Sequence, residues 1–172
     1  MQSVEFAGLR GPIIRLYFAT FLRVPDYAGL SFWINEYRGG RSLPSIAEAF
    51  ATAQEFTNTY GTLNNRAYVR QLYLNVLGRE PDPAGWDSWT GYLDRGEITR
   101  GALLVGFSES QEFQNRIRNK ERVTEAYFGM LRREPDPAGF ADNVAALDAG
   151  VSLAGLLNSF LNTGEYRARF LP

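Results

Sequence analysis

The sequence predicts an all-α protein built from three quasi-equivalent multi-helix repeats packed around a shared core. Three observations lead to this prediction. One pattern of residues occurs three times along the 172-residue chain. Within each copy, apolar residues are spaced by three and four, which places them on one side of an α-helix. No segment alternates apolar and polar residues over a useful length, so no β-sheet is expected.

Each copy is recognised by a tyrosine, an arginine and a Pro-Asp-x-Ala-Gly segment. These features are Tyr17, Arg23 and residues 25–29, then Tyr73, Arg79 and 81–85, and finally Tyr127, Arg133 and 135–139. Each copy closes with an acidic and an aromatic residue, at 55–56, 112–113 and 165–166. We therefore expect an N-terminal arm at 1–11 and repeats at 12–61, 66–117 and 122–170, together forming one compact domain.

The Pro-Asp-x-Ala-Gly segment predicts the end of one helix and the start of the next. Its first proline disfavours the α conformation of the preceding residue, which ends the first helix. The aspartates, Asp26, Asp82 and Asp136, are the expected N-caps of the second helix. A proline follows in the second and third copies, at a position that suits it, whereas the first copy has Tyr27. Residues 115–120 are either a linker or a place where two helices run together.

Glycine and hydroxyl residues predict the remaining helix boundaries. Gly40, Gly96 and Gly150 suit the left-handed residue that follows a helix. The expected N-caps of the third helices are Ser42, Thr99 and Ser152. A short closing turn comes next, where Thr52 to Glu55 and Asn162 to Glu165 have the spacing of capping boxes, and Glu109 breaks the pattern in the second copy.

The composition excludes several classes of function. The chain has no cysteine and no histidine, which excludes cysteine nucleophiles, histidine bases and the usual zinc, copper and haem ligands. The net charge is -1, and the basic cluster from Arg116 to Arg122 is offset by Glu121 and Glu125, so no nucleic-acid partner is expected. No apolar run approaches about 18 residues, so no membrane insertion is expected. The start lacks a signal-peptide pattern, which predicts a fragment of a larger protein or export without an N-terminal signal.

Recurring opposite charges predict structural ion pairs. We expect Arg23 with Glu55, Arg79 with Glu112 and Arg133 with Glu165 to tie the end of the first helix to the closing turn. The three aspartates could in principle bind a cation, but each loop offers too few oxygens for calcium, which takes six to eight. We therefore expect helix caps, with no metal and no cofactor.

Aromatic residues make up 14% of the chain. Most of them fall on the apolar side of their helices and are expected in the core. Phe32 and Tyr92 lie off that side and are expected to be exposed. Together with Trp86, they are candidate binding residues for a sugar ring or a protein partner.

The second copy carries these motifs most fully, from Arg70 through Tyr73, Pro81-Asp82 and Trp89 to Ser110 and Phe113. In this pattern the sequence resembles the bacterial domain-of-unknown-function family 4214, in three tandem copies that cover nearly the whole chain. The third copy departs from it with Asn143 in place of the tryptophan. A weaker likeness links the closing segment 162–170 to phycobilisome linker domains, which are helical scaffolds.

The resemblance implies a setting more than a mechanism. Such domains occur in bacterial secreted and cell-surface proteins, often beside calcium-binding RTX repeats, and they bring no catalytic residues to this sequence. We therefore expect an extracellular or cell-surface, non-catalytic interaction module that binds polysaccharide or a surface protein. The alternatives are a helical scaffold that self-assembles or links subunits, and a hydrolase that uses two carboxylates. The oligomeric state and the ligand are not indicated by the sequence.

Overall fold

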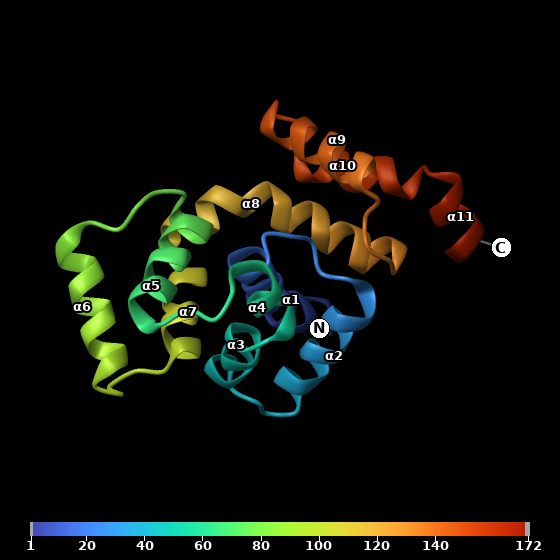
Figure 1. The fold of residues 1–172 in the computed structure, drawn as a ribbon. Helices are drawn as coiled ribbons and strands as arrows, with labels where there is room; N and C mark the ends of the chain where they lie inside the picture. Colours follow the sequence, from blue (N-terminus) through green and yellow to red (C-terminus); the bar gives the residue numbers. More distant parts are fainter. Residues whose placement is uncertain (1, 171–172) are drawn as a thin grey trace.

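A computed structural model describes the backbone of residues 2–170 and the side chains of residues 8–170. Every regular element in this part of the chain is a helix, which confirms the predicted all-α class (Figure 1). The elements are α1 (Gln2–Thr20), α2 (Tyr27–Arg38), α3 (Leu43–Ala51), α4 (Gln54–Tyr60), α5 (Asn65–Leu72), η1 (Tyr73–Leu77), α6 (Pro83–Asp94), α7 (Arg100–Ser108), α8 (Gln111–Ala126), η2 (Tyr127–Leu131), α9 (Pro137–Asp148), α10 (Leu153–Leu161) and α11 (Gly164–Phe170). None of the described helices is long and apolar enough to cross a membrane.

Three units are named here by their elements. The first unit is α1–α4, the second is α5, η1, α6 and α7, and the third is η2 and α9–α11, with α8 joining the second unit to the third. Their helix boundaries follow the short-range signals of the sequence. Asp26, Asp82 and Asp136 each cap a helix by accepting a hydrogen bond from the N–H three residues later. The capping serine or threonine begins α3, α7 and α10 as predicted.

The chain is helical at its described start and at residues 115–120. Residues 2–11, expected as an arm, are the first half of the continuous helix α1, in which Gly11 is buried. A Cβ atom at Gly11 would lie 2.8 Å from Glu121 Oε1, so the small residue lets α1 approach α8. Residues 115–120 are part of α8, so here two helices do run together.

Two wide π-helical turns continue α5 and α8. They are η1 and η2, and each begins at the recurring tyrosine of its unit, Tyr73 or Tyr127. Their C-terminal ends carry a left-handed residue, Gly78 with φ 67° and Arg132 with φ 52°. In the first unit, Leu22 has a similar φ of 56°. The helical spacing predicted helices here but not the change to π geometry.

The capping boxes predicted for the closing turns were wrong by one residue. Thr52 and Asn162 end the preceding helices, α3 and α10. The turns begin instead at Ala53 and Ser110, where the Ser110 hydroxyl accepts a hydrogen bond from Phe113 N at 3.2 Å. Thr163 caps the third turn through Tyr166 N at 3.1 Å. Because these caps lie two residues before each glutamate, the glutamate side chains are available to pair with arginine.

Buried residues form two clusters and not the single shared core that was expected. The larger cluster is built from the first and second units, α8 and Phe128 of η2, and it includes Leu16, Phe50, Leu104 and Phe113. The smaller cluster contains Val123 and Tyr127 together with residues of α9 and α10. Figure 1 shows the reason: α9–α11 lie along the outer side of α8, away from α3–α7. Phe140 is packed against both clusters and connects them.

The first and second units meet through a close contact of α3 and α7. Gly101 on α7 is buried, and a Cβ atom there would lie 2.3 Å from Pro44 O. The N–H of Gly101 donates a hydrogen bond of 2.6 Å to Glu48 Oε2, so a carboxylate of α3 lies at the N-terminus of α7. In Figure 1, α2 and α6 lie on opposite sides of this α3–α7 contact.

Candidate functional site

The residues that recur in the sequence form a similar small cluster three times. The tyrosine hydroxyl lies against the glycine of the motif, and a Cβ atom at Gly29 would be 2.5 Å from Tyr17 Oη. The same distance is 2.7 Å at Gly85 and 2.5 Å at Gly139. Asp26 Oδ1 accepts a hydrogen bond from Gly29 N at 2.7 Å. Burial, with the Asp26 charge nearby, raises the pKa of Tyr17 to about 12, so this hydroxyl stays protonated at neutral pH.

An arginine completes each cluster by covering the tyrosine ring and reaching the closing glutamate. Arg23 Cζ lies 5.2 Å from the centroid of the Tyr17 ring, and its Nε and Nη2 donate to Glu55 at 2.6 and 2.9 Å. Arg133 makes the same two-armed contact with Glu165, at 2.8 and 2.9 Å. These hydrogen bonds hold the pKa values of Glu55 and Glu165 below their usual range.

The second cluster is more open than the other two. Arg79 Nη2 lies 3.8 Å from Glu112 Oε2, beyond hydrogen-bond distance, and both side chains are about half exposed. The Arg79 guanidinium still lies over the Tyr73 ring, 5.5 Å from its centroid. All three predicted arginine–glutamate pairs are therefore present within 4 Å, but only the first and third are closed by hydrogen bonds.

The predicted aromatic binding residues do not form one surface. Phe32 and Tyr92 are exposed, with 53% and 39% of their surface accessible. They lie on α2 and α6, and α3 and α7 lie between these two helices (Figure 1). Trp86 is engaged within the fold, because its Nε1 donates to Arg66 O at 2.7 Å and the Arg66 guanidinium lies 4.0 Å from its ring centroid. A joint site of these three aromatics is therefore excluded by their positions.

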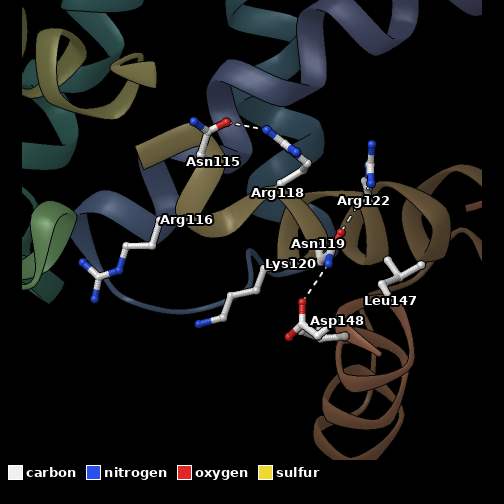
Figure 2. A pocket seen from close by; sticks show the side chains of 9 residues that line it. Asn115, Arg116, Arg118, Asn119, Lys120, Arg122, Leu147 and Asp148 are labelled. Carbon is white, nitrogen blue, oxygen red and sulfur yellow. Dashed lines mark hydrogen bonds between the residues drawn. The ribbon is translucent and has the colours of Figure 1, made fainter. Parts of the chain in front are cut away.

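A different group of side chains surrounds a pocket between α8 and α9. Figure 2 shows that Arg118 and Arg122 point to one side of α8 and that Arg116 and Lys120 point to the other side, on which Asp148 of α9 lies. The pocket has a volume of about 260 Å³. Its lining residues are Asn115, Arg116, Arg118, Asn119, Lys120, Arg122, Val144, Leu147 and Asp148. The site thus combines four cations with one carboxylate and two amides.

Hydrogen bonds hold several of these side chains in place. Asn119 Nδ2 donates to Asp148 Oδ1 at 2.7 Å, which links α8 to α9 at the centre of the pocket (Figure 2). Arg118 donates to Asn115, and Arg116 Nη1 donates to the Val76 carbonyl at 2.8 Å. The exposed guanidinium groups keep further N–H donors that these contacts do not use.

The acidic residues that were expected to offset this charge lie elsewhere. Glu121 Oε1 accepts a hydrogen bond from Arg15 Nη1 at 2.6 Å, and Arg15 also pairs with Glu109 at 2.5 Å. Glu125 is half-buried, and burial together with the Glu121 charge raises its pKa to about 7. Both glutamates are therefore part of an ionic network with α1. Their negative charges do not line the pocket between α8 and α9.

Comparison with known proteins adds one finding. Residues 47–117 match the family model described as "Domain of unknown function (DUF4214)", which supports the predicted family resemblance for this all-α protein. The matched segment begins inside α3 and continues through the second unit into α8, so it does not coincide with a predicted repeat. No curated protein and no solved structure shows a significant match. In the described part of the chain, no group of three or more histidine, cysteine, aspartate or glutamate side chains is placed to hold a metal ion.

The sequence of α8 indicates part of the basic pocket. Counting charges between residues 116 and 125 treats α8 as if all its side chains shared one surface. Arg118 and Arg122 each lie three residues before a glutamate, Glu121 or Glu125, so these four side chains occupy neighbouring positions on α8. Once α8 is recognised as continuous, its spacing places only Arg116 and Lys120 on the side away from the two glutamates. Asp148 has no such signal, because only packing brings α9 to this position.

Proposed function

We propose that the protein is a non-catalytic interaction module of a bacterial secreted or cell-surface protein, and that it binds an acidic extracellular polysaccharide. The observation that supports this most directly is the group of cations at the pocket between α8 and α9. Arg116, Arg118, Lys120 and Arg122 line this pocket, and neither Glu121 nor Glu125 is among its lining residues. The net charge of the whole chain is -1, so this local basic site is not a consequence of composition.

The chemistry of the pocket favours a uronic-acid polymer among anionic ligands. Arginine presents planar pairs of donors that match a carboxylate, and lysine adds a mobile point charge. The amides of Asn115 and Asn119 and the carboxylate of Asp148 suit sugar hydroxyls, which both donate and accept hydrogen bonds. The pocket lining lacks aromatic side chains on which nucleic-acid bases would stack. A sugar acid therefore fits this donor and acceptor set better than a nucleic acid.

We also infer that the chain carries three related copies of one domain type. The recurrence of the tyrosine, arginine, aspartate, glycine and glutamate cluster supports this inference. Related copies that each hold a rigid helical frame would give a polymer-binding protein repeated surfaces, and rigid elements reduce the ordering cost of binding.

Binding of polygalacturonate and alginate to the intact chain tests the proposal by isothermal titration calorimetry. Replacing Arg118, Lys120 and Arg122 with alanine should weaken binding at least tenfold, and affinity of the unmodified protein should fall steeply with salt. The matched control replaces Arg41, Arg70 and Arg95, which carry the same charge but lie on other surfaces. Absence of binding to both polymers, or an equal loss in both triple variants, would show that the pocket is not the binding site.

A further inference from the structure

A second pocket is lined in part by Glu112 of the open ion pair in the second unit, and Arg79 lies next to Glu112 but outside the lining. It has a volume of about 210 Å³, and its walls are mostly apolar side chains of η1, α6 and α7. Leu77, Trp89, Leu103 and Phe107 contribute these walls, and the carboxylate of Glu112 lies at the edge. Trp89 is only partly buried, so part of its ring faces the pocket. None of these residues belongs to the basic pocket on α8.

The first unit explains why space remains here. Phe21 occupies the position that corresponds to Leu77, and its ring stacks on Phe50 with centroids 5.2 Å apart and planes 29° apart. The Phe50 ring also packs against Trp33 at 5.3 Å, so three aromatic rings fill this part of the first unit. In the second unit the shorter Leu77 leaves the space beside Phe107 empty.

The same unit has the unclosed ion pair. Arg23 and Glu55 are joined by two hydrogen bonds, whereas Arg79 and Glu112 remain 3.8 Å apart. An adjacent donor and acceptor that do not bond each other are available to a ligand hydroxyl, which can accept from one and donate to the other. A cationic ligand is disfavoured, because the Arg79 charge lies next to the Glu112 carboxylate.

We propose that this pocket binds a neutral pyranose ring. The apolar face of the sugar would lie against Trp89, Leu103 and Phe107, and adjacent hydroxyls would bond to Glu112 and Arg79. Such a combination of apolar walls with a few polar groups at the edge is typical of small-ligand sites. The proposal rests on the missing side-chain volume and on the open ion pair, and it does not depend on the basic pocket on α8.

Tryptophan fluorescence and ligand-observed NMR test this site with the intact chain. The probes are hexasaccharides of β-1,4-glucose, α-1,4-glucose, β-1,4-mannose and N-acetylglucosamine. At least one should bind with a dissociation constant of about 1 mM or tighter, as expected for a single small site. Binding by none of the four at that strength would overturn the proposal.

The decisive variant is Leu77→Phe, which copies the first unit. It should fill the pocket and reduce sugar affinity at least tenfold, while the melting temperature stays the same or rises. Glu112→Gln should also weaken binding, and Glu55→Gln in the closed first pair is the matched control that should not. The triple variant of Arg118, Lys120 and Arg122 should retain neutral-sugar binding, which separates this site from the acidic-polymer site. Unchanged affinity in Leu77→Phe would place the sugar elsewhere and overturn the proposal.

Discussion

The first two units and the third unit are built with similar helices but are stabilised differently. The first and second units share one large cluster of buried residues, and α3 and α7 approach so closely that Gly101 is required between them. The third unit has its own small cluster and lies along one side of α8. Equivalent local signals therefore gave equivalent helices, but they did not give equivalent burial. A unit with a small core unfolds separately from the rest of the molecule more easily than a unit with a large core.

The junction between the two regions depends on departures from the repeated sequence. Tyr27 stands where the other copies have proline, so it keeps a backbone N–H that donates to Glu134 Oε2 at 2.8 Å. Its ring stacks on Phe128, with centroids 5.5 Å apart and planes 6° apart. Phe18 stacks on Phe140 in a second aromatic contact, at 6.3 Å. The residues in which a copy differs from its relatives thus mark where units contact one another.

The largest expected effect on stability comes from removing one buried ring from each of the two cores. Phe50→Ala removes a buried ring that contacts Tyr17 and Trp33, and it should lower the free energy of unfolding by about 3–5 kcal/mol. Phe160→Ala removes the ring that packs on Tyr127 in the smaller core and should unfold the third unit alone. Thermal melts by circular dichroism and tryptophan fluorescence check this difference.

All three tryptophans, at positions 33, 86 and 89, lie in the first and second units, so their fluorescence reports on the large core only. In Phe160→Ala, ellipticity should therefore fall at a lower temperature than the fluorescence changes. In Phe50→Ala, both signals should shift together. Coincident early transitions in Phe160→Ala would mean that the two regions unfold as one.

Two glycine-to-alanine substitutions compare how closely the helices pack in the two regions. Gly101→Ala introduces a Cβ atom 2.3 Å from the Pro44 carbonyl, so α3 and α7 must separate, at a cost of about 1–3 kcal/mol. Gly155→Ala on α10 brings a Cβ atom only to 3.3 Å from the Ser152 hydroxyl and should change stability by less than about 0.5 kcal/mol. Urea unfolding curves measure both, and equal losses would contradict a special closeness of α3 and α7.

Glu125 on α8, the helix that joins the second unit to the third, should make the stability of the protein depend on pH. The pKa of Glu125 is raised from 4.5 to about 7 by burial and by Glu121, so the folded protein binds a proton that the unfolded chain releases. The free energy of unfolding should therefore fall as pH rises from about 5 to 8. Glu125→Gln should remove most of this fall and stabilise the protein by about 1–2 kcal/mol at pH 8, allowing for partial solvent exposure. Urea unfolding at several pH values checks this, and an unchanged slope in the variant would contradict it.

The smallest effect concerns attachment of the third unit. Tyr27→Pro restores the residue of the other copies but removes both the N–H donated to Glu134 and the ring stacked on Phe128. Attachment should weaken by about 1 kcal/mol, seen as faster hydrogen exchange in α9 and unchanged exchange in α3 and α7. Tyr27→Phe keeps the ring and the N–H and is the control. Equal exchange in both variants would show that this contact does not hold the third unit.

The sequence by itself determined the helices, their caps and the three arginine–glutamate clusters. Asp26, Asp82 and Asp136 cap because each bonds to an N–H three residues away, which needs no other part of the chain. Such short-range interactions depend on residue type and spacing, so they recur wherever the pattern recurs. The one-residue error in the closing turns has two forms, because Thr163 caps the third turn in place of Asn162, whereas the first turn begins at Ala53 without a side-chain cap.

Only the tertiary structure decided how these equivalent elements are used. Three features depend on which helices pack together. They are the pairing of Glu121 with Arg15, the separate core of the third unit and the pocket beside Leu77. Packing of this kind is the sum of many weak contacts between residues far apart in the chain. A change as small as Phe21 to Leu77 leaves the helix intact but alters the space beside it. For that reason the helices were predictable from the sequence, while the candidate sites were not.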